Sequence, residues 1–172
     1  MDQKLNWYAV CTKSRCEKSL VSKLNEKGIE AWIPLQRTLK QWSDRKKRVE
    51  EVMIRSYIFV HIQPQQYDEV LKNPGAVRFI WFNGEPAVIP DSQIEILRLI
   101  SDSDVKVTTV ASRLAPGTPV KIIAGPLEGL TGELVNSCGK YHVVIRIDHV
   151  YSALSLTISP QFLEKIGAEK KR

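Results

Sequence analysis

Residues 52–62 read VMIRSYIFVHI and form the most apolar continuous stretch of the chain. β-Branched and aromatic residues dominate this stretch, a composition that is typical of a strand buried in a sheet. We therefore predict one strand over residues 52–62 and expect it to be the central strand of its sheet.

Strand and helix patterns alternate on both sides of this segment. Residues 5–11 are a predicted strand, and apolar residues at helical spacing predict a helix that follows it and ends at Gly28. Further strands are predicted over residues 30–33, 77–82 and 87–89, and further helices around residues 67–71 and over residues 91–100. The pattern indicates an α+β sandwich with an antiparallel-type sheet flanked by helices.

The pattern changes after residue 100. Residues 101–114 lose the apolar periodicity and gain small polar residues, so we interpret them as a linker. Short strands separated by glycine turns follow, and they predict a small five-stranded β-barrel. These strands are expected over residues 120–123, 132–135, 141–147 and 153–158. The predicted order is thus a first domain over residues 1–102, a linker over 103–114, a barrel over 115–168 and a basic tail over 169–172.

Composition limits the class of protein. The chain has 172 residues, of which 43% are hydrophobic and 26% charged, as in ordinary globular proteins. No stretch approaches the roughly 18 apolar residues that cross a bilayer, and the first residues lack the basic and apolar parts of a signal peptide. We therefore expect a cytoplasmic protein with no membrane partner.

The residues that usually carry catalysis or metal binding form no known motif. The three cysteines and three histidines lack the spacing of a zinc site or of a disulfide framework. Residues 125–132 are rich in glycine, but they lack the Lys-Ser/Thr pair of a P-loop and precede a strand where a P-loop precedes a helix. We expect no enzyme, no cofactor and no metal.

Positive charge is concentrated in one segment. The whole chain has 25 Lys and Arg against 19 Asp and Glu, whereas residues 37–48 hold six cations against Asp44 and also contain Trp42. Such a segment can follow a nucleic-acid backbone, or it can be a solvated charged hairpin, and the sequence leaves both interpretations open. More cations lie on and before the first predicted helix. The candidate nucleic-acid-binding residues are Lys13, Arg15, Lys18, Lys23, Arg45, Lys46, Lys47 and Arg48.

Several motifs together resemble one family. The segments WYAV at residues 7–10, GIEAWIP at 28–34 and YIFV at 57–60 resemble the N-terminal NGN domain of NusG transcription elongation factors. The segment GPLEGLTGELV at residues 125–135 resembles the KOW motif of the second, SH3-like domain. Residues 29–48 are most similar to specialised paralogues of the UpxY type. The resemblance implies an antiterminator that suppresses pausing and termination on long operons, such as those for surface polysaccharides.

The resemblance also implies a contact with RNA polymerase. NGN domains bind the polymerase clamp helices through an apolar depression, and the matching positions are Cys11, Ile54, Tyr57, Phe59, Phe79 and Trp81. The alternative is that these residues form the domain core; we favour the core for Phe59 and the interface for Tyr57 and Trp81. Where many members have Phe-Pro-Gly, this chain has Ile54, Arg55 and Ser56.

Other partners are implied by the same resemblance. The basic segment and first helix would approach upstream or non-template DNA, or nascent RNA, and the barrel would dock on Rho or on a small-subunit ribosomal protein. Relatives act as monomers. We expect Leu127 and Tyr151 to be exposed on the barrel and Leu130 to belong to its core. The candidate docking residues are Leu127, Leu130, Val150 and Tyr151.

A rival interpretation remains open. The chain could be an RNA- or ribosome-binding module that works through the KOW barrel. Its first domain would then be an RRM-like platform, on which Tyr57 and Phe59 would stack bases.

Overall fold

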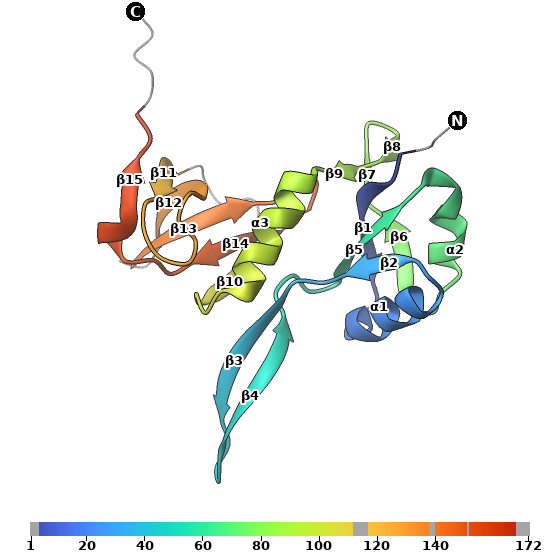
Figure 1. Cartoon of the computed structure of the whole chain (residues 1–172), viewed down its shortest axis with the longest axis horizontal. Helices are drawn as coiled ribbons and strands as arrows, with labels where there is room; N and C mark the ends of the chain where they lie inside the picture. Colours follow the sequence, from blue (N-terminus) through green and yellow to red (C-terminus); the bar gives the residue numbers. More distant parts are fainter. Residues whose placement is uncertain (1–3, 112–116, 138–139, 151, 168–172) are drawn as a thin grey trace, which may run out of the picture. The chain divides into compact units, whose positions relative to one another are not determined.

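The computed structural model describes residues 4–111, 117–137, 140–150 and 152–167. The chain divides into two compact units (Figure 1). The first unit runs to Leu97 and includes Asp148–Val150, and the second contains Arg98–Ile147 and the residues from position 151 onward. Each unit has its own sheet, which agrees with the predicted mixed α and β architecture.

The sheet of the first unit is antiparallel throughout. Its path runs β2-β5-β1-β6, and β9 also pairs with β1. The strands are β1 Asn6–Thr12, β2 Glu30–Trp32, β5 Tyr57–Ile62, β6 Ala76–Phe79 and β9 Val88–Ile89. Because β5 lies between β2 and β1, the apolar YIFVHI segment is an interior strand, as its composition predicts.

Two α-helices, α1 Glu17–Glu26 and α2 Tyr67–Leu71, lie within the first unit, and α2 follows a short 3₁₀ turn, η1 Pro64–Gln66. A third helix, α3 Asp91–Asp102, begins in the first unit and ends in the second. In α1, Leu20 and Leu24 are four residues apart and completely buried, so they form the inner face of the helix. The helix stops where predicted, because Gly28 adopts φ +79°, a conformation that glycine tolerates without a Cβ clash.

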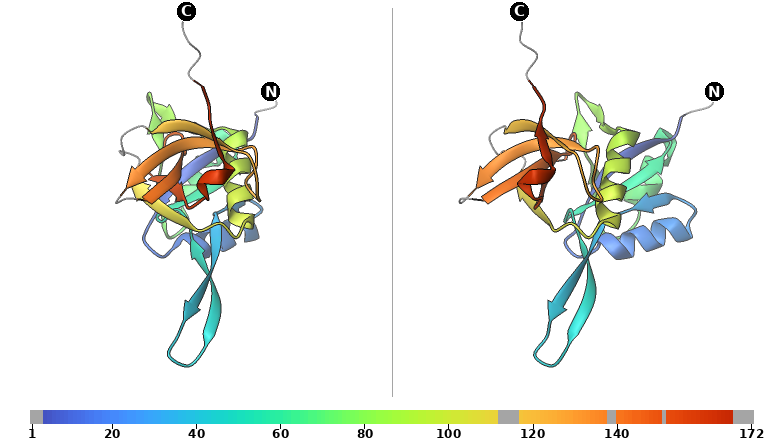
Figure 2. Two further views of the ribbon diagram at one scale, coloured as in Figure 1. Left: turned by 90° about the vertical axis from the view of Figure 1, so that its left-hand side faces the viewer. Right: turned by 60° about the vertical axis from the view of Figure 1, so that its left-hand side comes forward.

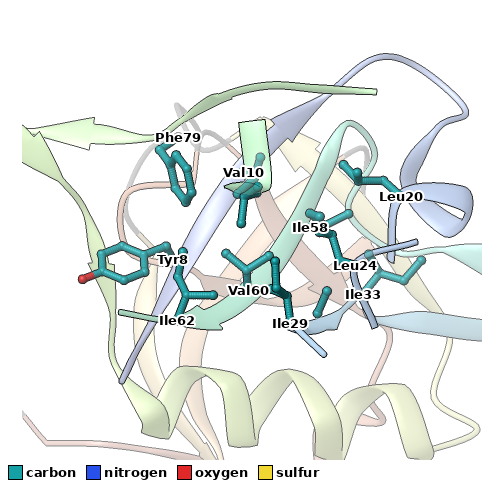
Figure 3. Packing of buried hydrophobic residues seen from close by; sticks show 12 residues of the cluster. Tyr8, Val10, Leu20, Leu24, Ile29, Ile33, Ile58, Val60, Ile62 and Phe79 are labelled. Carbon is teal, nitrogen blue, oxygen red and sulfur yellow. The ribbon is translucent and has the colours of Figure 1, made fainter. Parts of the chain in front are cut away.

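One hydrophobic cluster of the first unit lies on one face of its sheet (Figure 3). Trp7, Ala9 and Phe59 on the other face are buried as well. Alternate residues of β1 and β5 point to the face of the cluster, where α1 and α2 contribute Leu20, Leu24 and Val70. The cluster consists of Tyr8, Val10, Leu20, Leu24, Ile29, Ala31, Ile33, Ile58, Val60, Ile62, Val70 and Phe79. The residues of β1 and β5 that alternate with these point to the opposite face of the sheet.

The prediction of one strand over residues 52–62 is wrong. The segment is divided between β4 (Lys46–Val52) and β5, and residues 53–56 form no strand. Ser56 adopts φ +64°, which is incompatible with an extended strand. β4 instead pairs with β3 (Leu35–Gln41) in a separate two-stranded hairpin that projects away from the sheet (Figures 1 and 2).

A second predicted strand is also divided. Residues 77–82 belong partly to β6 and partly to β7 (Trp81–Phe82), which pairs with β8 (Glu85–Pro86). The turn between them has positive φ at Asn83 and Gly84, as expected for an Asn-Gly hairpin. This small hairpin holds Trp81 and Phe82 outside the main sheet.

The second unit contains one six-stranded antiparallel sheet with the order β10-β14-β13-β12-β11-β15. Its strands are β10 Val107–Ala111, β11 Thr118–Ile122, β12 Thr131–Ser137, β13 Lys140–Arg146, β14 Ser152–Leu156 and β15 Leu163–Lys165, and a 3₁₀ turn, η2 Pro160–Phe162, precedes β15. Val120, Ile122, Val143, Leu154 and Leu156 are among its buried residues.

Two elements of this sheet differ from the prediction. Residues 107–111 were expected in the linker, but they form β10, which pairs with β14 at five positions. Their Val-Thr-Thr-Val sequence has high β propensity, and the partner strand supplies the hydrogen bonds that a linker lacks. β15 was not predicted either, so the sheet has six strands where five were expected.

Candidate functional site

Three of the predicted polymerase-binding residues share one face of the first sheet. Cys11 and Tyr57 are direct partners across β1 and β5, and Phe59 lies two residues farther along β5, opposite Ala9. Residues two apart on a strand point to the same side, so these side chains form a row on the face opposite the core cluster. Cys11 and Tyr57 are partly exposed, whereas Phe59 is completely buried.

Aromatic groups extend this row beyond the predicted residues. Trp32 pairs with Phe59 across β2 and β5, and their ring centroids are 6.2 Å apart. At the other end of the row, the rings of Trp7 and His61 stack at 4.8 Å, and His61 also contacts Glu30 through Nδ1 at 2.8 Å. Trp7 lies four residues before Cys11 on β1, so the alternation of the strand could have predicted that it belongs to this row. Trp32 joins the row because β2 pairs with β5, and the sequence does not reveal that pairing.

Phe79 and Ile54 do not belong to an exposed surface. Phe79 is 3% exposed and lies on the core face, with its ring 4.7 Å from that of Tyr67 and 6.1 Å from that of Tyr8 (Figure 3). Ile54 is completely buried in the segment before β5. For these two residues the structure gives the core alternative: the alternation of β6 places Phe79 on the core face, and Ile54 is buried in the segment between β4 and β5.

Trp81 is 56% exposed, and its neighbour Phe82 is 55% exposed. The β7–β8 hairpin holds both residues, with Trp81 opposite Pro86. An exposed indole is expected at a binding surface, because it provides a large contact area with one polar atom. Sequence analysis selected Trp81 but missed Phe82.

The base of the β3–β4 hairpin has neutralised charges. Arg37 forms an ion pair with Glu50 at 3.7 Å, and Lys40 forms one with Glu51. The hydrogen bond from the Lys40 ammonium lowers the pKa of the Glu51 carboxyl below its usual value. Thr38 Oγ1 also donates to Glu51 at 3.4 Å. Both acidic residues of β4 therefore form ion pairs with cations of β3.

The outer end of the same hairpin is different. Arg45, Lys46, Lys47 and Arg48 are all exposed, and within the described part of the chain none of them forms an ion pair. Two large apolar side chains are exposed beside them, Trp42 at 58% and Leu39 at 67%. We define residues 39–48 as the hairpin tip. The four consecutive cations predicted as nucleic-acid contacts thus lie together on it.

The structure brings some of the helix cations to the base of the hairpin. Arg15 and Lys18 line a cleft of about 600 Å³ together with Lys40 and Arg55. Lys18 Nζ donates to the carbonyl oxygen of Glu50 at 2.8 Å. Lys13 and Lys23 are exposed but do not line this cleft. The remaining lining residues are Ser14, Glu17, Glu50, Glu51 and Val52.

A buried carboxylate fixes this region, and sequence analysis missed it. Glu17 is 5% exposed at the start of α1, and its carboxylate accepts the backbone N–H of Ser56 at 2.8 Å. Ser56 and Arg15 both adopt positive φ, +64° and +65°. Glutamate at a helix start suggests only a favourable dipole interaction, so nothing in the sequence marks Glu17 as the link between α1 and the segment before β5.

The predicted docking residues of the second part are mostly buried. The expectation that Leu127 is exposed is wrong: it is 1% exposed, because the 125–129 turn packs it into the small core of this sheet. Val150 is 4% exposed, Leu130 is partly exposed, and Tyr151 lies outside the described residues.

An ion pair joins two neighbouring strands of the second unit. Arg146 on β13 donates to Glu133 on β12, with Nη2 3.0 Å from Oε2 and Nε 3.2 Å from Oε1, and Gly117 N–H also donates to Oε2 at 3.1 Å. The hydrogen bonds from Arg146 lower the pKa of the Glu133 carboxyl. Sequence analysis gave these residues no role.

Over the described ranges, no three His, Cys, Asp or Glu residues gather in a way that could hold a metal ion. Cys11 and Cys16 are free thiols. None of the helices in the described part of the chain has the length and apolar character that crossing a bilayer requires.

An antiparallel sheet with helices, a projecting basic hairpin and a separate small sheet define a two-unit architecture that known proteins share. The model of the NusG family, described as transcription termination factor, matches residues 5–98. The chain therefore belongs to the NusG family of transcription factors. No curated protein matches the chain.

Solved structures are similar to this chain to different degrees. A structure of Thermotoga maritima NusG, described as showing domain interaction, is 22% identical, covers 95% of this chain and 98% of its own, and has a TM-score of 0.58. A structure of the MjSpt4:Spt5 complex is 16% identical, covers 93% of this chain and 97% of its own, and has a TM-score of 0.31. The first of these likenesses supports a NusG-like fold for the chain.

Proposed function

We propose that this chain is a transcription elongation factor that binds RNA polymerase through its first unit. The observation that carries the proposal is the partly exposed pair Cys11–Tyr57, which lies beside Phe59 on the face of the sheet opposite the core cluster. This row has the apolar and aromatic character that a pair of clamp helices would contact. Trp81 adds a second exposed aromatic group in the same unit.

The action we propose is mechanical. A protein that binds one conformation of the polymerase more tightly than the paused or terminating conformations shifts the population toward elongation. Only a few kcal/mol of differential binding are required. Such a factor needs a surface that docks on the polymerase and a second contact with the transcription complex. It does not need a catalytic group.

We further propose a specialised antiterminator of the UpxY type, acting in the cytoplasm as a monomer on long operons such as those for surface polysaccharides. The resemblance of residues 29–48 to those paralogues supports this role. The exposed cations of the hairpin tip would then contact non-template or upstream DNA, or nascent RNA.

The six-stranded second unit is proposed to be the KOW barrel, docking on Rho or on a small-subunit ribosomal protein. The KOW-like sequence of residues 125–135 supports this assignment. Of the three docking positions that the structure describes, Leu127 and Val150 are buried and Leu130 is partly exposed, so Leu130 carries this part of the proposal.

The burial of Phe59 argues against the rival RRM-like platform. A base-stacking platform needs aromatic faces that are open to the ligand. Phe59 has no exposed surface, so Tyr57 would have to act without it. The elongation-factor proposal is therefore the one that the geometry supports better.

The test is binding of the purified full-length chain to core RNA polymerase. We expect saturable binding that weakens about 30-fold, roughly 2 kcal/mol, in Tyr57→Ala, because truncating a central aromatic anchor has a cost of this size. Val77→Ala is the matched control, since Val77 is 51% exposed on β6 and is not part of the proposed surface.

Polymerase binding must then translate into function. Wild-type protein should increase read-through of a terminator in a purified transcription assay, and Tyr57→Ala should lose that effect while keeping its circular dichroism spectrum. Absence of wild-type binding would refute the proposal. Equal polymerase affinity of Tyr57→Ala and Val77→Ala would show that the polymerase does not bind at the row that contains Tyr57.

A further inference from the structure

The hairpin tip presents an exposed indole ring. The backbone N–H of Trp42 donates to the carbonyl oxygen of Arg45 at 2.8 Å, which closes a tight turn over Ser43 and Asp44. Trp42 is 58% exposed and makes no ring contact with any described residue. A large aromatic face is thus presented to solvent beside a turn that a backbone hydrogen bond closes.

Free cations lie on the same face of the hairpin as this indole. The register pairs Lys40 with Lys47 and then Gln41 with Lys46. The backbone bond between Trp42 and Arg45 continues this register by one position, which is on the same face as Lys40 and Lys47. Neighbouring positions on one face are about 7 Å apart, so Lys47 and Arg45 flank the indole closely. Lys40 forms an ion pair with Glu51, whereas Arg45 and Lys47 form none in the described part of the chain and can contact a ligand.

Charge varies along the hairpin in a way that favours a polyanion at its outer end. Glu50 and Glu51 lie near the base and pair with Arg37 and Lys40. From residue 41 to residue 48 the one acidic residue is Asp44, against four cations. A ligand with regularly spaced negative charges would therefore be attracted to the tip.

We propose that the hairpin tip is a stacking site for unpaired nucleobases, with Trp42 as the platform and Arg45 and Lys47 as phosphate partners. This inference rests on the nucleic-acid contact in the proposed function and adds the state of the ligand. An indole face is useful only to a base that has left its own stack, because bases inside a duplex already cover each other's faces. The ligand is therefore a single strand, and stacking on Trp42 tolerates any sequence.

The test compares ligands of equal charge. Fluorescence anisotropy would measure binding of the full chain to an oligothymidylate of roughly 15 nucleotides, to an abasic strand of equal length and to the matching duplex. An oligouridylate of the same length distinguishes RNA from DNA as the source of the single strand. Wild type should bind the thymidylate at least about fivefold more tightly than the abasic strand, since one stacked base contributes that much or more.

Three variants assign the effect to the indole. Trp42→Ala should remove the preference over the abasic strand, and Trp42→Phe should keep most of it because a ring remains. Phe82→Ala is the matched control, because Phe82 is an equally exposed aromatic on another hairpin, and it should leave the preference unchanged. Lys47→Ala should reduce the salt dependence of binding by about 0.7 in log–log slope, the value for one phosphate of a single strand.

Several results would overturn the inference. Equal affinity for thymidylate and abasic strands, or an unchanged preference in a folded Trp42→Ala protein, would remove the stacking role. Tighter Trp42-dependent binding to anionic lipid vesicles than to any strand would assign the tip to a membrane surface instead. Polymerase binding is measured separately, so a chain that binds polymerase without base preference keeps the proposed function and loses this inference.

Discussion

The Glu17 carboxylate accepts the backbone N–H of Ser56 at 2.8 Å, across 39 residues of sequence. This bond links the start of α1 to the segment between the projecting hairpin and β5. The backbone N–H of Thr12 adds a second link, because it donates to the carbonyl oxygen of Ser56 at 2.9 Å. Ser56 therefore depends on both neighbours for its left-handed conformation.

Glu17→Ala should destabilise the first unit by about 2 kcal/mol, because it removes the charged acceptor of the partly buried Ser56 N–H. All four tryptophans precede residue 82, so denaturant unfolding followed by tryptophan fluorescence reports on this unit. Glu26→Ala on the exposed end of α1 is the control and should change stability by less than about 0.5 kcal/mol. Equal losses in the two variants would contradict the role of Glu17.

Ser56→Gly should stabilise the first unit or leave it unchanged, within about 1 kcal/mol, because glycine adopts φ +64° without strain. Ser56→Val should destabilise it clearly, since a β-branched side chain is excluded from this conformation. The same fluorescence measurement ranks the three proteins. The order Gly, Ser, Val is expected, and a valine variant as stable as wild type would refute the strain argument.

The Glu133–Arg146 pair should make the second unit less stable in acid. The folded-state pKa of Glu133 is lowered, so its contribution is present above the unfolded pKa of roughly 4.3 and is lost as pH falls through the folded value. Glu133→Gln should cost about 1.5 kcal/mol at pH 7, and this difference from wild type should shrink toward zero near pH 3.

Urea unfolding followed by far-ultraviolet circular dichroism at both pH values would test this prediction. Glu164→Gln on β15 is the control, because Glu164 is exposed and has no described ion pair. A Glu133→Gln penalty that stays constant with pH would show that packing, and not charge, carries the effect.

Gly132→Ala should destabilise the second unit by about 1–3 kcal/mol. A Cβ at this position would lie 2.7 Å from Val143 Cγ1 and 3.0 Å from the carbonyl oxygen of Val144, so β12 and β13 would have to separate. Gly167→Ala is the matched control, because its Cβ would meet nothing within 4 Å. Thermal unfolding of both variants should give a lower Tm for Gly132→Ala alone.

Periodicity was sufficient to predict the elements whose environment repeats along the sequence. Leu20 and Leu24 place α1 correctly, and Gly28 marks its end. The interior position of β5 follows from its continuous apolar composition. In these elements the local secondary-structure propensity agrees with the burial that the fold imposes, so the sequence pattern predicts the element correctly.

The errors occur where another part of the chain decides the outcome. The apolar character of Met53 and Ile54 hides the break before β5, because both are buried outside the strand. β10 exists because β14 pairs with it, and a short Val-Thr segment does not reveal its partner. The face occupied by Phe79 is set by its pairing with Val10, and the sequence does not reveal that partner.

The β3–β4 hairpin extends the first unit well beyond its main sheet. Each of its strands has seven residues, so the tip stands roughly 23 Å beyond the base. Length can change without a change in surface chemistry: removing two consecutive cross-strand pairs would keep the register and the face of each side chain while shortening the arm. A change in the number of cross-strand pairs would therefore move the exposed cations of the hairpin tip relative to the sheet of the first unit.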